Sequence, residues 1–452
     1  MAYRRPGHGG FLPAGIPAPG QLSRSRAMPN NKNVLIIGGG LLGVTTAWYL
    51  AERGFRVTVV ERRESTALET SSANGGLVTP SQSDPWNAPG TFLHLLRWLG
   101  REDSPLLLRM GALPGVWRWG FRFLLASRAT PWWRSAEANL RLGLYSVASL
   151  RQLREQLCLD YDSLSLGTLK LFRDPQALER SAVLARSLAP MGLEFRVLDA
   201  AGAVELEPLL QPLVGSLAGA IHYPADESGD AQAFTRQLEK RAREAGAEFR
   251  FGVEVRRIDV QGGRVTGLGT GNGTLVADAY VLAAASFSPL LAEPIGLHLP
   301  IYPVKGYSVT LSAKDWKRRL SLPLVDFEQK VVITPLGPRL RIAGTAEFAG
   351  YDATLNPRRG AHILRHALEL VPEIAAQAEH AQVQHWTGLR PMTSDGPPAV
   401  GATRYANLYI NTGHGPLGWT LAAGSSRALA DLMAGNTPEL DMTPYSPARF
   451  TR

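Results

Sequence analysis

A glycine-rich turn between a buried strand and a helix constrains the fold of this chain more than any other feature. Residues 34–37 are a wholly apolar run of the kind found in buried parallel strands. Three glycines follow with the spacing G-x-G-x-x-G, namely Gly38, Gly40 and Gly43. A helix is expected from about residue 42 to residue 53, and a second strand over residues 56–60 ends at Glu61. These residues predict one strand-helix-strand unit.

A unit of this kind binds the pyrophosphate of a dinucleotide, because the glycines let backbone N–H groups and the helix N-terminus approach it. We assign these contacts to the turn and the start of the helix, at Gly38, Gly40, Leu41, Leu42 and Gly43. Glu61 stands at the end of the second strand, where an acidic side chain can bind a ribose hydroxyl. We also assign Arg62, the next residue, to the cofactor site. Glu61 nevertheless disfavours a 2'-phosphate on the ribose, because the two negative charges would repel each other. The pattern predicts FAD or NAD; the alternative is a glycine-rich turn without a ligand.

The length and composition are those of a globular protein with two or three domains. The chain has 452 residues, of which 45% are apolar and 19% are charged. Its only cysteine, Cys158, excludes an internal disulfide and cysteine-cluster metal sites, and we expect no metal. The net charge of +9 suits an anionic cofactor, anionic lipid or nucleic acid. We find no nucleic-acid-binding pattern and therefore expect no nucleic acid partner.

The remaining periodicity predicts further elements around this unit. Residues 1–32 have no period and are expected to form a disordered extension. Strands are expected at 168–172, 219–223, 248–251 and 279–284, with a hairpin formed by 253–258 and 264–268. Antiparallel strands are expected at 307–311, 330–334 and 340–343, and helices at 231–245, 359–370 and 419–433. The antiparallel strands are expected to form a separate layer.

Two further stretches carry residue types that suit a cofactor. Residues 69–76 are small and polar, and their candidate contacts are Ser71, Ser72, Ala73, Asn74 and Gly75. Residues 411–420 lead into the last helix, whose N-terminus would stabilise negative charge on a reduced flavin. The candidates there are Gly413, His414, Gly415, Leu417, Gly418, Trp419 and Thr420. Read alone, the first stretch is an ordinary loop and the second an ordinary helix start.

Residues 385–396 hold a candidate substrate contact. Arg390 stands between a strand end and Pro391, where its planar guanidinium can face a carboxylate. The alternative is an ion pair between Arg390 and Asp395. Local sequence favours neither of these interpretations.

Together these stretches resemble the FAD-dependent D-amino-acid dehydrogenases, within the wider glycine oxidase and D-amino-acid oxidase family. The most specific pieces are residues 68–74, 167–172, 226–230, 302–308, 386–392 and 411–415. The resemblance implies an α/β fold, with a Rossmann-like FAD-binding domain assembled from discontinuous segments plus an antiparallel-sheet substrate domain. It assigns residues 33–90, 231–297 and 390–438 to the first domain, and residues 91–230 and 298–389 to the second.

The resemblance also implies a reaction. A D-amino acid is oxidised by hydride transfer from Cα to N5 of FAD, and the imine is hydrolysed to a 2-oxo acid and ammonia. Arg390 matches the arginine that binds the substrate carboxylate, and Tyr307 is expected to be a second pocket contact. Val255 is assigned to the cofactor site. We name no general base, although His222, His385 and His414 are candidates, and His414 is kept among the catalytic residues.

For the electron acceptor we expect a quinone, and for the location the cytoplasm or the cytoplasmic face of the inner membrane. In the Trp- and Arg-rich helical segment 92–134, we expect the aromatic contacts with the membrane from Trp98, Trp117, Trp119, Trp132 and Trp133. The expected contacts with anionic lipid are Arg97, Arg109, Arg118 and Arg122. The alternative is that this segment packs within the protein.

Other functions stay open at this point. One is an oxygen-using amino- or imino-acid oxidase, or a dehydrogenase for D-proline or hydroxyproline. Another, outside the enzymes, is a basic protein that only holds a nucleotide. Lys305 would favour oxygen if it lay beside the flavin, but a lysine before a glycine at a strand start is expected to be a solvated turn residue.

Overall fold

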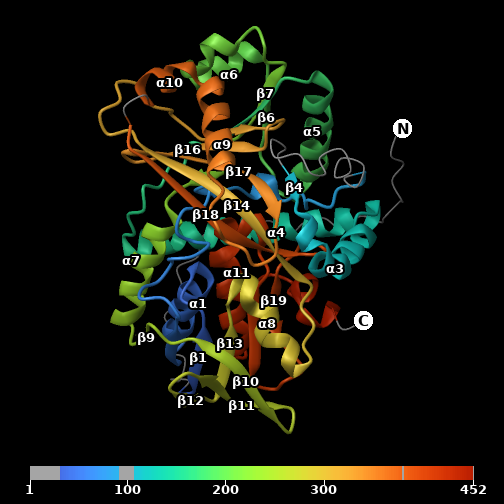
Figure 1. The fold of residues 1–452 in the computed structure, drawn as a ribbon, viewed down its shortest axis with the longest axis vertical. Coiled ribbons are helices and arrows are strands. Elements are labelled where there is room, and N and C mark those ends of the chain that lie inside the picture. Colours follow the sequence, from blue (N-terminus) through green and yellow to red (C-terminus); the bar gives the residue numbers. More distant parts are fainter. Residues whose placement is uncertain (1–30, 91–105, 379–380, 451–452) are drawn as a thin grey trace.

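The computed structural model describes residues 31–90, 106–378 and 381–450, and its two main parts are each built on a sheet (Figure 1). The first sheet has six strands in the order β19-β20-β13-β1-β2-β9. Their bounds are β1 Asn33–Ile37, β2 Arg56–Val60, β9 Glu248–Arg250, β13 Ala279–Leu282, β19 Ala399–Ala402 and β20 Leu408–Thr412. All neighbours are parallel except β19 and β20. The doubly wound order places the ends of β1, β2 and β13 at one edge.

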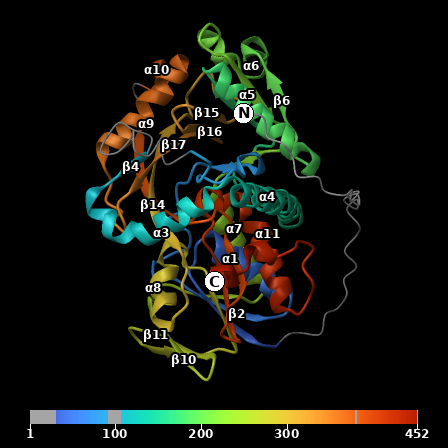
Figure 2. The same ribbon diagram turned by 90° about the vertical axis from the view of Figure 1, so that its right-hand side faces the viewer.

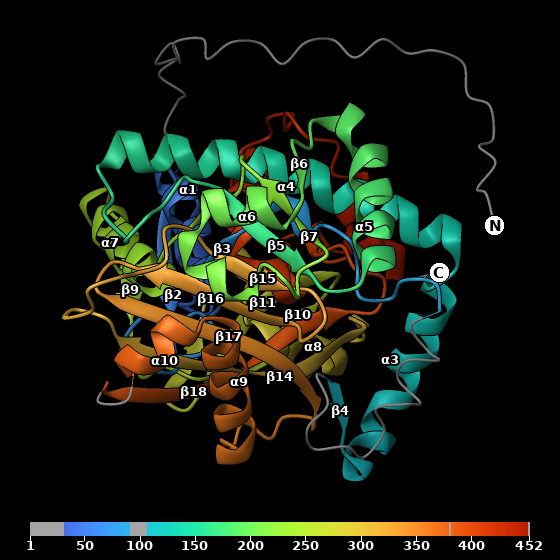
Figure 3. The ribbon, with the colours of Figure 1, turned by 90° about the horizontal axis from the view of Figure 1, so that it is seen from above.

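Four helices share a core with one face of this sheet, and the short α8 packs on the other face together with the hairpin of residues 255–270. Their bounds are α1 Leu41–Glu52, α4 Ala129–Leu157, α7 Ala231–Glu244, α8 Ser288–Ala292 and α11 Gly418–Met433. Figure 3 shows the long α4 running along one side of the molecule. It lies in the stretch that the sequence assigns to the substrate domain, yet Leu142 and Leu150 pack in one core with α1 and α11. The domain division as a whole stays a prediction.

The second sheet has nine strands in the order β18-β14-β17-β16-β15-β5-β7-β6, with β4 paired to β17. Their bounds are β4 Leu106–Leu108, β5 Thr168–Phe172, β6 Arg196–Leu198, β7 Gly219–Tyr223, β14 Ile301–Ser312, β15 Leu324–Asp326, β16 Val331–Leu336, β17 Arg339–Phe348 and β18 Val383–Thr393. Only the pairs β15–β5 and β17–β4 are parallel. The predicted antiparallel layer and the predicted fold class are therefore confirmed.

The two faces of the second sheet have different neighbours. The helices α6 Ala200–Leu206, α9 Pro357–Leu370 and α10 Pro372–Ala378 cover the outer face (Figure 2). Tyr307 and Val309 of β14 point into this outer core. Because side chains alternate along a strand, Gly306 and Ser308 face the other way, toward the first part. The inner face of β14 therefore lies against the loop that follows β2, where Ser308 Oγ donates to the Ala73 carbonyl.

The smaller elements connect these layers. They are α3 Leu113–Ala126, α5 Pro175–Leu188, the sheet of β10 Val255–Gln261, β11 Arg264–Thr270 and β12 Gly273–Leu275, and the pair β3 Leu77–Val78 and β8 Glu227–Ser228. The 3-10 helices are η1 Pro80–Gln82, η2 Met110–Ala112, η3 Ala189–Met191, η4 Pro208–Leu213, η5 Ala285–Phe287, η6 Glu293–Ile295, η7 Gly415–Leu417, η8 Thr443–Tyr445 and η9 Pro447–Phe450. No helix among the described ranges is long and apolar enough to cross a membrane.

The predicted elements are found close to their expected bounds. The strands at 56–60, 168–172 and 219–223 are confirmed residue for residue. The hairpin gains a third strand, and the strand expected at 330–334 begins at Val331 because Lys330 has a positive φ of 55°. The expectations for residues 1–30 and 91–105 fall outside the described residues.

Candidate active site

The turn between β1 and α1 is compact enough to need its glycines. A Cβ on Gly43 would lie 1.9 Å from the Gly38 carbonyl oxygen, and Gly38 itself has a φ of +109°. The N-cap of α1 is Gly40, which offers no capping side chain, and Ser71 Oγ accepts from the Leu41 amide at 3.2 Å. Ser71 thus takes one amide of the first turn, and the absence of an N-cap side chain leaves the positive end of α1 open to a phosphate.

A cleft of about 350 Å³ opens beside this turn. Six predicted cofactor contacts line it: Gly38, Gly40, Glu61, Arg62, Ser71 and Val255. Its walls also contain residues that the sequence analysis missed: Ala67, Leu68, Thr70, Ala283, Ala284, Ala285, Phe287, Leu290 and Leu291. The strand predicted at 279–284 was the signal for part of this set, since β13 pairs in parallel with β1 and ends at the same edge.

Glu61 is held in this cleft by two backbone amides. Its Oε2 accepts from the Gly39 amide at 2.7 Å, and its Oε1 accepts from the Arg63 amide at 2.8 Å. These two bonds leave lone pairs on the carboxylate for the hydroxyls of a ribose. The carboxylate is thus fixed at the end of β2, as predicted for a dinucleotide site.

Arg62 does not present a free charge to the cleft. Its guanidinium donates to both oxygens of Glu69, at 2.8 and 2.7 Å, and its Cζ lies 3.9 Å from the centre of the Phe287 ring. Burial raises the pKa of Glu69, but the hydrogen bonds from Arg62 and Arg63 outweigh it and hold that pKa below its usual value. A 2'-phosphate would therefore be repelled by the negative charge of Glu61, and the positive charge of Arg62, already paired with Glu69, would not offset this repulsion.

The loop after the cleft joins the two sheets. Its carbonyl groups at Ala73, Asn74 and Gly75 accept from Ser308, Arg341 and Thr334, at 2.7, 2.9 and 2.7 Å. Ser72 Oγ accepts from Gln232 Nε2 at 3.0 Å. The loop is therefore fixed between cleft and second sheet, and the cofactor contacts of Ser72, Ala73, Asn74 and Gly75 stay a prediction.

The loop before α11 supplies a second uncapped helix start. Gly413 and Gly415 have positive φ values of 79° and 54°, and a Cβ on Gly413 would lie 2.7 Å from Thr393 Cγ2. No side chain caps the N-terminus of α11 at Leu417, and Thr420 Oγ1 accepts from the Thr79 amide. The cofactor contacts from Gly413 to Thr420 stay a prediction.

The three candidate histidines are not placed for acid–base work. His414 is 3% exposed, and its Nε2 lies 3.0 Å from Ser425 Oγ in α11. Burial lowers the pKa of His414 to about 3, so its ring is neutral at physiological pH. The ring therefore packs against α11, and the catalytic role of His414 stays a prediction. His222 Nε2 bonds the Leu166 carbonyl, and His385 is exposed along β18.

Arg390 is a charged side chain on the inner face of the second sheet. Its guanidinium donates to the Thr345 carbonyl at 3.0 Å, and its Cζ lies 5.8 Å from the centre of the Trp86 ring. No ion pair joins Arg390 to a carboxylate within the described residues. The alternative pair with Asp395 is wrong, because Asp395 accepts from Arg449 Nε at 2.8 Å. Burial lowers the pKa of Arg390 to about 10, which leaves it cationic at neutral pH.

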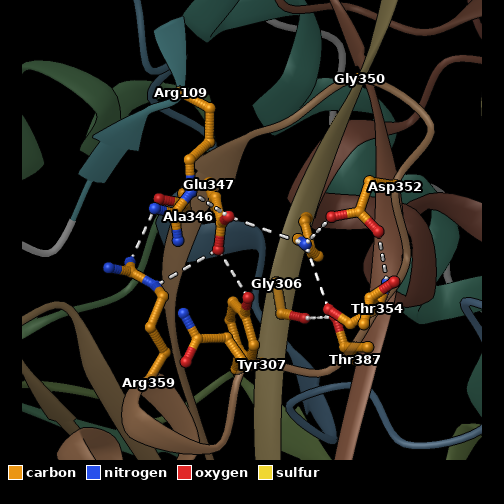
Figure 4. A network of polar contacts seen from close by, with 12 residues as sticks. Arg109, Gly306, Tyr307, Ala346, Glu347, Gly350, Asp352, Thr354, Arg359 and Thr387 are labelled. Carbon is orange, nitrogen blue, oxygen red and sulfur yellow. Dashed lines mark hydrogen bonds and ion pairs between the residues drawn. The ribbon is translucent and has the colours of Figure 1, made fainter. Parts of the chain in front are cut away.

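Tyr307 lies on the opposite face of β14 and is not a pocket contact. Its hydroxyl donates to Glu347 Oε2 at 2.5 Å, and Arg109 Nε donates to the same carboxylate at 2.8 Å (Figure 4). The prediction of Tyr307 as a substrate contact is wrong because the strand register turns its side chain toward the outer core.

Lys305, expected to be a solvated turn residue, lies in the same outer network as Tyr307. It is 2% exposed, and its Nζ donates to Asp352 Oδ2 at 2.9 Å and to the Thr354 carbonyl at 3.2 Å. The reason for its burial is that β14 is an interior strand, between β18 and β17, with both faces covered. Lys305 also does not face the first part, because it has the same strand parity as Tyr307.

The parallel sheet carries a glycine turn and an anchored acid. It faces a second sheet whose Arg390 guanidinium has no ion pair among the described residues. Together these features define a dinucleotide-dependent enzyme of the flavoprotein type. A family model described as FAD dependent oxidoreductase matches residues 33–432. The chain therefore belongs to the FAD-dependent oxidoreductase family. Its cofactor is FAD, and the alternatives of NAD and of a protein without enzymatic activity are wrong.

Individual relatives agree with this family. The chain is 44% identical over 419 residues to a D-amino acid dehydrogenase from Paramagnetospirillum magneticum, covering 92% of this chain and 99% of that one. It is 41% identical to a D-amino acid dehydrogenase from Agrobacterium fabrum over 92% and 99% of the two chains. The predicted resemblance is thus confirmed.

Solved structures share the fold. A glycine oxidase from Geobacillus kaustophilus matches with a TM-score of 0.72 and 25% identity, over 93% of this chain and 99% of that one. An L-proline dehydrogenase from P. horikoshii matches with a TM-score of 0.74 and 21% identity, over 94% and 99%. The similarity to the L-proline dehydrogenase, at 21% identity, shows a shared fold only.

The residues of the cleft fit FAD. The N-cap residue of α1 has no side chain to occupy the helix start beside the cleft, and the Glu61 carboxylate is fixed at the end of β2 for a ribose. The start of α11 is likewise uncapped. Within the described ranges there is no cluster of three or more His, Cys, Asp or Glu side chains placed for a metal.

Proposed function

We propose that this protein oxidises D-amino acids to 2-oxo acids and ammonia, with Arg390 holding the substrate carboxylate. The observation that carries the proposal is the half-buried guanidinium of Arg390, which has no ion pair with a carboxylate in the described part of the chain and is held by a single backbone carbonyl. A partly desolvated cation without a counter-ion is costly, and a substrate carboxylate would relieve that cost. Bound FAD supplies the hydride acceptor, its N5 atom.

The protein's own part in this reaction is positioning. Arg390 offers two parallel N–H donors to a carboxylate, which fixes both the place and the plane of the substrate. The Trp86 ring lies beside the guanidinium and reduces its contact with water. Removal of a hydride from Cα requires an uncharged substrate amine and no protein nucleophile. A neutral His414 is compatible with such a site.

The experiment that tests this function is anaerobic reduction of the purified flavoprotein. D-Alanine and a panel of other D-amino acids should bleach the flavin absorbance, whereas their L-enantiomers should not. Imino acids such as D-proline belong in the panel, because they separate a broad dehydrogenase from one for cyclic substrates. An absorbance unchanged by every D-amino acid would reject the proposal.

We further propose that a quinone in an anionic membrane accepts the electrons, and that α3 contacts this membrane. Trp117 and Phe121 are each 61% exposed on α3, and Leu124 and Leu125 are exposed beside them. Arg118 is exposed on the same helix. An amphipathic helix with aromatic and basic residues is typical of a helix that lies in a membrane surface.

The structure corrects several residues of the predicted membrane surface. Trp119 is buried, and its indole N–H donates to the Met392 carbonyl. Trp132 and Trp133 are half-buried, and Arg109 pairs with Glu347. Trp98 and Arg97 lie outside the described residues. The proposed contact surface is therefore the exposed face of α3.

Two measurements test the acceptor and the membrane contact. Stopped-flow reoxidation of the reduced flavin should be faster with a water-soluble quinone than with oxygen, and the reverse order would favour an oxidase. Co-sedimentation with phosphatidylglycerol vesicles should weaken in a Trp117→Ala, Phe121→Ala double variant. A matched double variant of exposed apolar residues away from α3, Val183→Ala with Val197→Ala, should sediment like the wild type.

A further inference from the structure

The strand β17 contains a bulge at the point where Arg390 reaches it. Lys305 and Tyr307 of β14 are two positions apart, whereas their partners in β17, Glu347 and Gly344, are three positions apart. Between these two pairs β17 therefore has one residue more than β14. A bulge leaves its extra residue outside the regular ladder of hydrogen bonds, so its backbone groups can bind other partners.

One backbone group of this bulge holds the guanidinium of Arg390. The bulge consists of Thr345 and Ala346, and the carbonyl of Thr345 accepts from Arg390 Nη1 at 3.0 Å. The φ of Thr345 is +54°, in the left-handed region that a β-branched residue rarely adopts. A strained residue keeps such a conformation only where the surrounding structure holds it. The place of the guanidinium therefore depends on the groups that hold the bulge.

These groups lie on the outer face of the second sheet. Glu347, the residue after the bulge, is 2% exposed, and its Oε2 accepts from the Tyr307 hydroxyl at 2.5 Å (Figure 4). Because Tyr307 is paired with Gly344, the residue before the bulge, this hydrogen bond joins the two ends of the bulge. Arg359 of α9 is 1% exposed, and its Nε lies 3.7 Å from Glu347 Oε2. Its Nη2 donates to the carbonyl of Ala346, within the bulge, at 3.4 Å.

The Glu347 carboxylate carries its charge in this buried position. Burial raises the pKa of Glu347, but the hydrogen bonds from Tyr307 and Arg109 outweigh it and hold that pKa below its usual value. Lys305 Nζ, 3.7 Å from Glu347 Oε1, favours the same charged form. A cluster of buried charges is costly to desolvate, and an apolar core of the same volume is often as stable. What the charges add is one fixed arrangement of the strands that they join.

We propose that Glu347 is a positioning residue for substrate binding, which holds the bulge of β17 so that the Thr345 carbonyl fixes the guanidinium of Arg390. This inference rests on the proposed function, in which Arg390 holds the substrate carboxylate. Glu347 itself faces away from the substrate, on the outer face of the sheet. The guanidinium donates two parallel hydrogen bonds to a carboxylate only in one orientation, so a loosened bulge weakens carboxylate binding.

The test measures carboxylate binding in a Glu347→Gln variant of the FAD-loaded enzyme. Glutamine keeps the volume but loses the charge, and it exposes an N–H to neighbours that only donate. The dissociation constant of propanoate, measured by the perturbation of the flavin spectrum, should rise about tenfold, and the KM for D-alanine should rise by a similar factor. The kcat should stay within about twofold of the wild-type value, because uniform binding is lost. The affinity of the apoprotein for FAD should be unchanged.

A double-mutant cycle shows whether the effect acts through Arg390. In an Arg390→Lys background, the Glu347→Gln change should alter the KM for D-alanine less than about twofold, because the planar fork that Glu347 positions is already absent. A merely structural role of Glu347 would leave the two effects additive. Tyr307→Phe removes one hydrogen bond from Glu347 but keeps the ring in the outer core, and it should weaken propanoate binding about threefold or more. This milder variant decides the question if Glu347→Gln does not fold.

Glu207→Gln is the matched control. Glu207 is also a buried carboxylate, 1% exposed beside the outer core, and its oxygens accept from the amides of Leu209 and Ser321. This change should lower the melting temperature and leave the dissociation constant of propanoate unchanged.

Two results would overturn the inference. One is propanoate binding that neither Glu347→Gln nor Tyr307→Phe weakens, and the other is a full tenfold effect of Glu347→Gln in the Arg390→Lys background. Failure of D-alanine to reduce the wild-type flavin would instead reject the proposed function, as would an unchanged KM in the Arg390→Lys single variant.

Discussion

The guanidinium of Arg390 lies over Gly306, so close that a Cβ on Gly306 would come within 2.5 Å of Arg390 Cζ. The two residues belong to neighbouring strands, and Val304 is directly opposite Arg390 in the register. Arg390 therefore reaches across β14 to the Thr345 carbonyl only because Gly306 has no side chain.

A Gly306→Ala variant should consequently lose substrate binding. The methyl group would displace the guanidinium, and we expect kcat/KM for D-alanine to fall at least about tenfold, with normal FAD content. Gly120→Ala is the control, since a Cβ there would meet nothing within 4 Å. Equal activity of the two variants would contradict the role given to Gly306.

An Arg390→Lys variant tests the carboxylate contact itself. Lysine keeps the charge but loses the planar pair of donors, so we expect kcat/KM to fall about 100-fold, or roughly 3 kcal/mol. FAD content, read from the absorbance ratio, should be unchanged. Arg449→Lys, in an arginine that pairs with Asp395 away from the site, should keep normal kinetics. Near-normal turnover in the Arg390→Lys variant would reject the assignment.

A Glu61→Gln variant tests the cofactor cleft. The amide group of glutamine would place its own N–H against a backbone N–H that now donates a hydrogen bond to the carboxylate. The affinity of the apoprotein for FAD should therefore fall about tenfold or more. Titration of apoprotein with FAD, followed by quenching of flavin fluorescence, measures this. The exposed Glu248→Gln change on β9 is the control and should leave the affinity unchanged.

The pH dependence of stability should depend on Asp226. Burial raises the pKa of this carboxyl to about 6 in the folded protein, and the hydrogen bonds from Ser81 and Thr168 offset only part of that rise. Because the folded pKa is above the unfolded one, its contribution is favourable at low pH and is lost as the pH rises through about 6. Relative to the wild type, an Asp226→Asn variant should therefore become more stable as the pH rises from 4.5 to 7.5. The difference between their free energies of unfolding in urea should change by about 1–3 kcal/mol over this range. A constant difference across that range would contradict this account.

His414 should not shape the pH profile of catalysis. Since burial keeps its ring neutral, a His414→Gln variant should show the same pH dependence of kcat between pH 6 and pH 9 as the wild type. Loss of an ionisation from the profile would restore His414 as an acid–base group.

Residues close together in the chain could be placed from the sequence. The turn from Gly38 to Gly43 and the acid at Glu61 were predicted, because strand, turn and helix signals act over a few neighbouring residues. Arg390 was expected between a strand end and Pro391, whereas β18 continues through both residues to Thr393. The cleft walls at Phe287 and Leu291 were missed, since only the pairing of β13 with β1 brings them to the cofactor.

Local sequence was enough to predict the dinucleotide turn and to place Arg390 next to Pro391 at a strand. The face that each strand residue presents depends on long-range pairing, which directs Tyr307 and Lys305 away from the site and leaves Gly306 beneath Arg390. Side chains alternate along a strand with a period of two, so pairing with distant strands selects the face. The bulge of β17, where Thr345 and Ala346 both face Gly306, depends on the same pairing, and no local sequence pattern predicts it.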